Sequence, residues 1–181
     1  MDERLKFVAR RLAGEPMSEL CREFGDFSAP DEMRQIIGSV SGQWRALFAT
    51  LATTGLRCEE AFGLHIDDLD LASGRIFVRG SVWNGQEVTT KTKAGVRAID
   101  IEPALVSLLS GHLAGRTAGR VFQTRAGTPF SKGNVRRKLR EVLTKLNLPM
   151  GGLHAFRHGR VSFHAISLRQ FCRGLRTSRQ R

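Results

Sequence analysis

The sequence contains no tyrosine, and cysteine is scarce. Its three cysteines, Cys21, Cys58 and Cys172, lie far apart and show no Cys-x-x-Cys spacing. This pattern argues against a disulfide framework or a zinc site, so we expect reduced thiols and no metal or other cofactor. The chain also lacks a run of about 18 apolar residues and the apolar core of a signal peptide, which favours a cytoplasmic protein with no membrane partner.

Acidic residues are outnumbered by basic ones. Lysine and arginine total 29 against 17 aspartates and glutamates, giving a formal net charge of +12 over 181 residues. Such an excess favours a polyanionic partner, and nucleic acid fits it better than an acidic membrane. Hydrophobic residues make up 41% of the chain, enough to bury the core of one ordinary domain.

Residues 1–25 are predicted to form two short amphipathic helices joined by a turn at Gly14-Glu15-Pro16. The runs 1–15 and 20–25 resemble the N-terminal helix-turn-helix start of insertion-sequence transposases. In such a motif the next helix would enter the major groove of DNA. Here residues 26–30 intervene, so two interpretations stay open: a DNA reader, or a helical hairpin packed on the main domain.

Between residues 28 and 64, apolar residues recur at helical spacing, which predicts three successive helices. A capping pattern over residues 28–31, with proline in the first turn, marks the start of the first helix. The aromatic residues of this region are expected in the core rather than on a base-stacking surface. The inward-facing set is Met33, Ile36, Ile37, Val40, Trp44, Leu47, Phe48, Leu51, Leu56, Ala61, Phe62 and Leu64.

After residue 71 the apolar pattern alternates, as in strands. Three strand candidates, residues 75–79, 87–91 and 95–101, are flanked by turn signals such as Trp83-Asn-Gly85. They predict a small three-stranded antiparallel sheet with Lys91 near a hairpin tip. With a further helix opening at Glu102-Pro103, the expected fold is mainly α with this small sheet, an α+β domain.

A basic amphipathic helix is predicted over residues 131–148, with Val135, Leu139, Val142 and Leu146 facing inward. Basic residues on its outer face form either an ordinary solvated surface or a set of phosphate contacts. The candidates for DNA binding are Arg136, Arg137, Lys138 and Arg140.

A compact basic motif follows a Pro-Met-Gly-Gly break at residues 149–152. His154, Arg157 and His158 share one face if this segment is helical, because residues three and four apart project together. A planar guanidinium flanked by imidazoles suits a phosphate better than a metal. Taken alone, the motif is more typical of a solvated basic helix start.

Three motifs in order strengthen the phosphate interpretation. Thr54-Gly-Leu-Arg57 with Glu60, a strand-hairpin lysine, and His154-x-x-Arg157-His158 resemble the catalytic domain of the tyrosine recombinase (phage integrase) family from about residue 28 to residue 162. The resemblance implies a double-stranded DNA substrate and strand exchange by phosphodiester transesterification, on a homo-oligomer assembled on DNA.

The resemblance also implies roles for the two arginines and the histidines. Arg57 and Arg157 match the pair that clamps the non-bridging phosphate oxygens as charge builds in the transition state. His154 matches an acid/base or phosphate-orienting position, and His158 matches a supporting one.

The hairpin lysine would protonate the departing 5′-oxygen. Lys91 is the best match, and Lys93 is an alternative because the hairpin register is uncertain by one or two residues. The other interpretation is that both are ordinary surface lysines. Glu60 matches a supporting position that holds an arginine or a helix end, and an ordinary cap or ion pair would explain it as well.

The family-like sequence stops near Ser162-Phe163, so we divide the chain into residues 1–27, 28–163 and a basic tail, 164–181. The tail has no Gly-His pair and no tyrosine, which leaves a phosphate clamp without a nucleophile. We therefore expect a recombinase-type domain that binds DNA but does not cleave it alone. The alternatives are a non-enzymatic DNA-binding or regulatory module, using residues 1–25 and 131–148, and a remnant of fused mobile elements.

A frameshift or early truncation would explain the composition of the tail. If so, translating the other two reading frames downstream of the codon for Phe163 is expected to reveal a Gly-His pair and a tyrosine at family spacing. Sequencing the encoding locus checks this. If neither frame contains them, the tail is the protein's own and the non-cleaving DNA-binding interpretation moves ahead.

Overall fold

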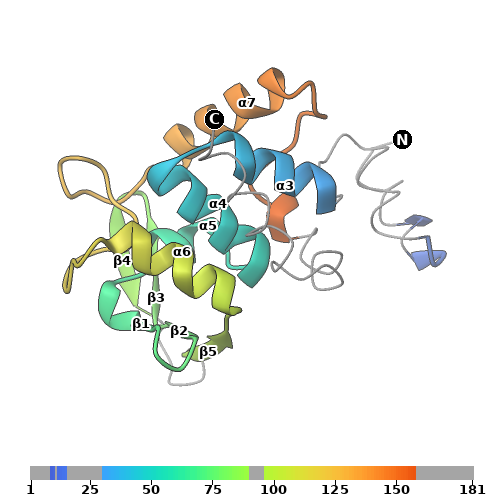
Figure 1. The fold of residues 1–181 in the computed structure, drawn as a ribbon. Coiled ribbons are helices and arrows are strands. Elements are labelled where there is room, and N and C mark those ends of the chain that lie inside the picture. The colour runs from blue at the N-terminus through green and yellow to red at the C-terminus, as the bar shows by residue number, and fades with distance from the viewer. Residues whose placement is uncertain (1–8, 11, 16–29, 90–95, 158–181) are drawn as a thin grey trace.

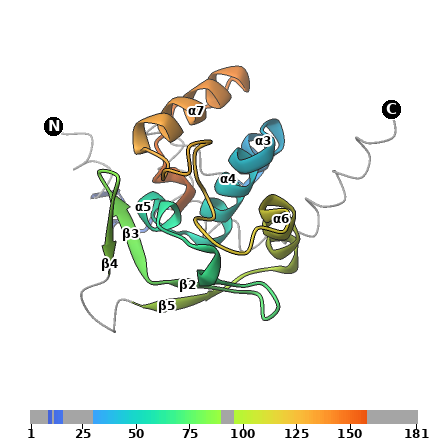
Figure 2. The ribbon, with the colours of Figure 1, turned by 90° about the vertical axis from the view of Figure 1, so that its left-hand side faces the viewer.

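The computed structural model describes residues 9–10, 12–15, 30–89 and 96–157. Over residues 30–157, helices pack above a small antiparallel sheet, as Figures 1 and 2 show. The expected α+β architecture is confirmed. Most of residues 1–25 and the whole tail after residue 163 lie outside the described residues; one helical backbone bond, from the Ala13 N–H to the Ala9 carbonyl, falls inside.

Two helices begin the domain. Helix α3 spans Pro30–Ser39 and places proline at its first position, with Asp31 and Glu32 in its first turn, where carboxylates favour the helix dipole. Helix α4 spans Gly42–Thr54 and is buried along most of its length. It ends at Gly55, whose φ of 66° is the left-handed conformation that glycine adopts without strain.

The three-stranded sheet contains β1 (Leu69–Asp70), β2 (Arg75–Val78) and β5 (Arg97–Asp100), all antiparallel in the order β1-β2-β5. A short 3-10 helix, η1 (Ile66–Asp68), leads into β1. Ile76 of β2 pairs with Ile99 of β5. Directly opposite residues share a face of the sheet, so this face turns toward the apolar core.

The candidate strand at residues 87–91 belongs to a different sheet. Residues Gln86–Thr89 form β4, which pairs antiparallel with β3 (Gly80–Trp83), and in the three-stranded sheet the third place goes to β1. The separate hairpin follows from its turn. Asn84 and Gly85 have φ values of 49° and 80°, the left-handed pair that a tight two-residue hairpin requires. The expected hairpin tip near Lys91 lies outside the described residues.

Polar contacts and close packing fix this hairpin to the rest of the domain. The carboxylate of Glu87 accepts hydrogen bonds from Arg120 and from His65 Nε2, the latter at 2.8 Å. On the inner face, a Cβ added at Gly63 would lie 2.9 Å from the Cα of Ser81, so only glycine allows this approach. Helix α5 (Cys58–Phe62) ends just before Gly63 and packs against β3.

Two further helices complete the fold. Helix α6 spans Pro103–Leu113 with Glu102 as its N-cap residue, as predicted. Helix α7 spans Lys132–Lys145, inside the predicted range of 131–148, and the Ser131 hydroxyl caps it by accepting the Asn134 N–H at 3.2 Å. Within the described residues no helix is long and apolar enough to cross a membrane.

Aromatic rings join distant segments in the core. Phe48 of α4 stacks on Phe156 at 5.4 Å between ring centroids, and Trp44 stacks on Phe130 at 4.9 Å. Phe48 and Phe156 are fully buried. These contacts confirm the prediction that the aromatic residues of α4 serve the core, and they hold the segment around residue 156 against the helix that precedes Gly55.

Replacing Phe156 with alanine should lower the free energy of unfolding by about 3–5 kcal/mol, because a buried ring is lost and a cavity remains. Urea denaturation followed by circular dichroism measures the effect. Trp83→Ala serves as the control, since its side chain is 61% exposed and its loss should change stability by no more than about 0.5 kcal/mol. Equal losses in both variants would contradict the packing described.

Candidate functional site

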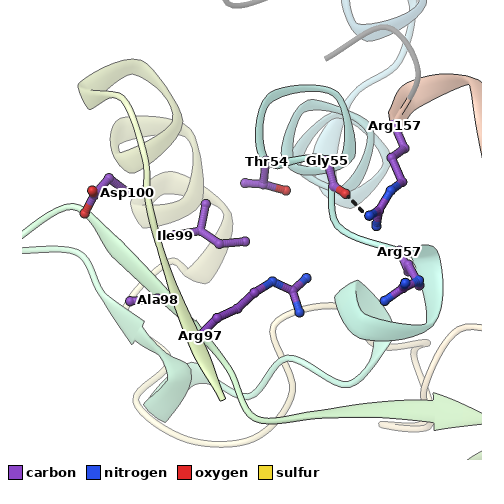
Figure 3. Close-up of a pocket in the computed structure, with 8 residues that line it drawn as sticks. All are labelled: Thr54, Gly55, Arg57, Arg97, Ala98, Ile99, Asp100 and Arg157. Atoms are coloured by element: carbon purple, nitrogen blue, oxygen red, sulfur yellow. Dashed lines mark hydrogen bonds between the residues drawn. The ribbon is translucent and has the colours of Figure 1, made fainter. Parts of the chain in front are cut away.

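Three arginines from separate elements line one cavity of about 630 Å³. Arg57 comes from the start of α5, Arg97 from β5, and Arg157 from the short helical segment near residue 156. Figure 3 shows their guanidinium groups extending into the same opening. The remaining lining residues are Thr54, Gly55, Ala98, Ile99 and Asp100.

The end of α4 directs Arg57 into this cavity. The Thr54 hydroxyl donates to the Thr50 carbonyl at 2.6 Å and accepts the Leu56 N–H at 3.2 Å. Gly55 then reverses the chain in the left-handed conformation, and its N–H bonds to the Leu51 carbonyl. The Thr-Gly-Leu-Arg motif is thus a helix stop that sets Arg57 immediately before α5.

Arg157 reaches the same cavity from the other side. Its Nη1 donates to the Gly55 carbonyl at 3.4 Å, a long hydrogen bond between residues 102 positions apart. The buried ring of Phe156 fixes the adjacent backbone, and the Arg157 N–H bonds to the His154 carbonyl. Within the part of the chain that the structure describes, no ion pair neutralises Arg157. The structure thus brings together the two arginines that the sequence predicted as a pair.

Glu60 links two of the arginines. Its carboxylate accepts the Arg57 backbone N–H at 2.9 Å and Arg57 Nη1 at 3.2 Å. Arg97 grips the same carboxylate with two bonds, Nη1 to Oε1 at 3.1 Å and Nη2 to Oε2 at 2.8 Å. Burial alone would raise the pKa of Glu60, but hydrogen bonds from Arg97 and the Arg57 N–H, with the two positive charges, hold that pKa below its ordinary value.

Sequence reasoning did not identify Arg97. A signal existed, because residues two apart in a strand share a face, and Arg97 therefore shares a face with Ile99, which packs against the core. Its register partner Val78 is buried as well. A charged residue on the apolar face of a strand needs a partner of opposite charge, and Glu60 is that partner.

A second cavity, of about 330 Å³, also borders the arginine pair. Arg57 and Arg157 line it as they line the first, together with His154, Lys132 and Arg136. His154 is therefore brought to the pair, as predicted. The other lining residues are Leu56, Cys58, Glu59, Gly152 and Leu153.

A chain of polar contacts forms one wall of this second cavity. Lys132 Nζ lies 2.5 Å from Glu59 Oε1, and the Cys58 thiol lies 3.0 Å from Glu59 Oε2. Partial burial would raise the pKa of Glu59, but hydrogen bonds from Cys58 and Lys132 bring it down to about 2. Burial and the neighbouring Glu59 raise the pKa of Cys58 to about 12, so its thiol stays protonated at neutral pH.

The four basic candidates on α7 do not all face the same part of the protein surface. Arg136 lines the second cavity beside Arg57 and Arg157. Arg137 donates to Asn134 at 2.9 Å, while Lys138 pairs with Glu141 at 3.0 Å. Lys138 lines a separate cavity against the α3–α4 junction, and Arg140 is exposed. Their expected role in binding DNA stays a prediction.

Lys91, Lys93 and His158 fall outside the described residues, so their predicted roles also remain predictions. No group of three or more potential metal ligands occurs within residues 30–89 and 96–157 or the short described stretches before them. Arginine, lysine and histidine outnumber the carboxylates Asp100 and Glu59 among the residues that line the two cavities, and this excess of cationic donors suits an anion.

Comparison with known proteins identifies the class. Residues 27–166 match the Phage integrase family, and the chain belongs to that family. It is 30% identical over 146 residues to the tyrosine recombinase XerC of Halalkalibacterium halodurans, covering 76% of this chain and 48% of that protein. It is 32% identical over 163 residues to the ICEBs1 integrase of Bacillus subtilis, covering 79% of this chain and 44% of the integrase.

Solved structures share the fold. The Tn1549 transposon integrase in complex with transposon right end DNA superposes with a TM-score of 0.65 at 20% identity, over 81% of this chain and 56% of that one. The XerA recombinase superposes with a TM-score of 0.59 at 24% identity, over 77% of this chain and 48% of that one. The chain thus spans about half the length of the curated relatives it matches.

Glu59→Gln should change how stability depends on pH. Because the folded-state pKa of Glu59 is depressed, its stabilising effect is present above the unfolded value of about 4.3 and is lost as pH falls toward about 2. The difference in Tm between wild type and variant should therefore be largest near neutral pH and shrink across that window. Thermal melts at several pH values measure it.

Glu141→Gln is the matched control, because it removes the carboxylate of an exposed ion pair on the same helix that carries Lys132. Surface pairs of this kind contribute little, so its Tm should stay close to that of wild type throughout. A wild-type to Glu59→Gln difference that does not vary with pH would contradict the assignment.

Proposed function

We propose that this chain is a DNA recombination domain whose arginine pair binds a backbone phosphate of double-stranded DNA. The observation that carries the proposal is the convergence of Arg57 and Arg157, from segments 100 residues apart, on cavities lined by further cations. Family membership and relatives named as recombinases and integrases support it. The proposed unit is residues 28–163, and its substrate is read through phosphates rather than bases.

The chemistry follows from the arrangement of charge. In phosphodiester transesterification, negative charge builds on the non-bridging oxygens, and guanidinium groups already in place stabilise it without reorganising. Arg57 is held by Glu60 and Arg157 by Gly55, so both are positioned before a phosphate arrives. His154 lines the second cavity together with the arginine pair, and its proposed role is to orient the phosphate or to transfer a proton.

The nucleophile of the proposed reaction class is a tyrosine hydroxyl, and the 181 residues contain none. We propose that a polypeptide of these residues binds DNA without forming a covalent phosphotyrosine bond. The departing 5′-oxygen would take its proton from Lys91, with Lys93 as the alternative donor, only when another chain supplies the attacking hydroxyl. Assembly as a homo-oligomer on DNA does not supply it, because every copy lacks it.

The surface beside the pair extends the proposed contact with DNA. Lys132 and Arg136 line the cavity that Arg57 and Arg157 share, and α7 carries the remaining candidates, Arg137, Lys138 and Arg140. Contacts of this type release condensed counterions, so affinity should fall steeply as salt rises.

Arg57→Gln and Arg157→Gln should each weaken binding to duplex DNA and reduce the slope of log K against log[KCl] by about one, because each removes one phosphate contact. Fluorescence anisotropy with a 30-base-pair duplex at several KCl concentrations measures both. Arg34→Gln is the control, since it removes one positive charge from an α3 surface pair with Asp31. A shallow wild-type slope, or equal effects of all three changes, would refute the proposal.

Incubation with a nicked duplex, followed by denaturing electrophoresis, tests the proposal that the protein binds DNA without forming a covalent bond to it. The expected result is no protein–DNA adduct from wild type under conditions in which anisotropy shows binding. A denaturation-resistant adduct would show that some other residue attacks the phosphate.

A further inference from the structure

Arg97 is a third cation in the cavity that the arginine pair lines. It stands on β5, 37 positions from Glu60 along the chain, and reaches that carboxylate with both Nη atoms. Figure 3 shows its side chain rising from the strand toward Arg57. Its side chain is 43% exposed, although the carboxylate that it binds is only 10% exposed.

The charges around Glu60 do not balance. One carboxylate is shared by two guanidinium groups, Arg57 and Arg97, which leaves an excess positive charge at the junction. Arg157 adds another on the opposite wall. Asp100 also lines the cavity, but it is highly exposed and its charge is paired with Arg75 at 3.0 Å. The cavity therefore carries more positive charge than the pair Arg57 and Arg157 would supply alone.

Donor geometry gives Arg97 capacity for a ligand. A guanidinium has five N–H donors, and the two-pronged contact with Glu60 uses two of them. The same contact restricts the rotation of a long side chain, so less entropy is lost when a further anion binds. Glu60 thus holds Arg97 in place, and three N–H donors of this cavity-lining guanidinium are not used by that contact.

The first cavity extends past the arginine pair along the sheet. Its lining continues from Gly55 and Arg157 to residues 97–100 of β5, whereas the second cavity does not include Arg97. A DNA strand that is seated on Arg57 and Arg157 and follows this lining would bring its next phosphate toward β5.

We propose that Arg97 binds a second phosphate, the neighbour of the one held by Arg57 and Arg157 on the same strand. This inference rests on the proposed function. It makes Arg97 a substrate-contacting residue rather than only a support for Glu60. The ligand that it recognises is a nucleic acid backbone with at least two consecutive phosphates.

The test compares Arg97→Gln and Arg97→Lys with wild type, using the same 30-base-pair duplex and KCl series. Arg97→Gln should lower the slope of log K against log[KCl] by about one and weaken binding. Arg97→Lys should keep the wild-type slope, because an ammonium still carries the charge that a phosphate needs. Arg34→Gln, which should leave the slope unchanged, is the matched loss of one charge.

A purely supporting role predicts a different pattern. A lysine cannot make the two-pronged contact with Glu60. If Arg97 acted only through Glu60, Arg97→Lys would therefore be as defective as Arg97→Gln. That result, or an unchanged slope in Arg97→Gln, would overturn the proposal. If Arg97→Gln is unaffected while Arg57→Gln and Arg157→Gln lose binding, this inference fails and the proposed function stands; if none of them changes binding, the proposed function fails.

A measurement on the unaltered protein guards against a variant that does not fold. Wild type labelled with ¹⁵N-arginine is titrated with 5′-phosphorylated thymidine dinucleotide, which carries two phosphates, and with unphosphorylated dinucleotide, which carries one. The Arg97 Nε signal, assigned in wild type by through-bond correlation with the backbone after uniform ¹³C/¹⁵N labelling, should shift only with the first. An Arg97 signal that stays in place while those of Arg57 and Arg157 shift would refute the second phosphate site.

Discussion

The shared carboxylate of Glu60 is the interaction on which the candidate site depends. It joins the start of α5 to β5 through Arg57 and Arg97, and so ties the helical layer to the sheet at the edge of the cavity. A buried carboxylate is costly unless it is paired and hydrogen-bonded, and here both arginines and a backbone N–H satisfy it. Loss of Arg57 or Arg97 would leave the buried Glu60 carboxylate with less compensating positive charge. This carboxylate therefore holds α5 and β5 together through the two arginines.

Gly55 positions Arg157, as Glu60 positions Arg57 and Arg97. Its left-handed conformation ends α4, turns the chain toward Arg57 and presents the carbonyl that Arg157 contacts. The stack of Phe48 on Phe156 brings the distant segment to that carbonyl. The packing of Phe156 therefore positions the backbone of Arg157, and the hydrogen bond to the Gly55 carbonyl orients its guanidinium group.

Much of this arrangement could be predicted because it is local. Helical spacing identified α3, α4 and α7, and the family resemblance of the motifs ending at Arg57 and starting at His154 indicated the arginine pair. Strand partnership could not be read in the same way, since alternation in residues 87–91 is compatible with either neighbouring strand and the Asn84-Gly85 turn decides between them. Alternation in β5 puts Arg97 on the apolar face, but its partner Glu60 lies 37 positions earlier and could not be identified from local periodicity.

The site joins residues that are 37 and 102 positions apart, through contacts from both layers of the domain. Bringing such distant segments together costs loop-closure entropy before any contact compensates for it, so local helices form more readily than the complete site. A fragment or a partly folded chain can contain α4 and α7 and still have no anion-binding cavity. The proposed phosphate affinity would thus be a property of the finished fold, and an anion bound there would shift the folding equilibrium toward the native state.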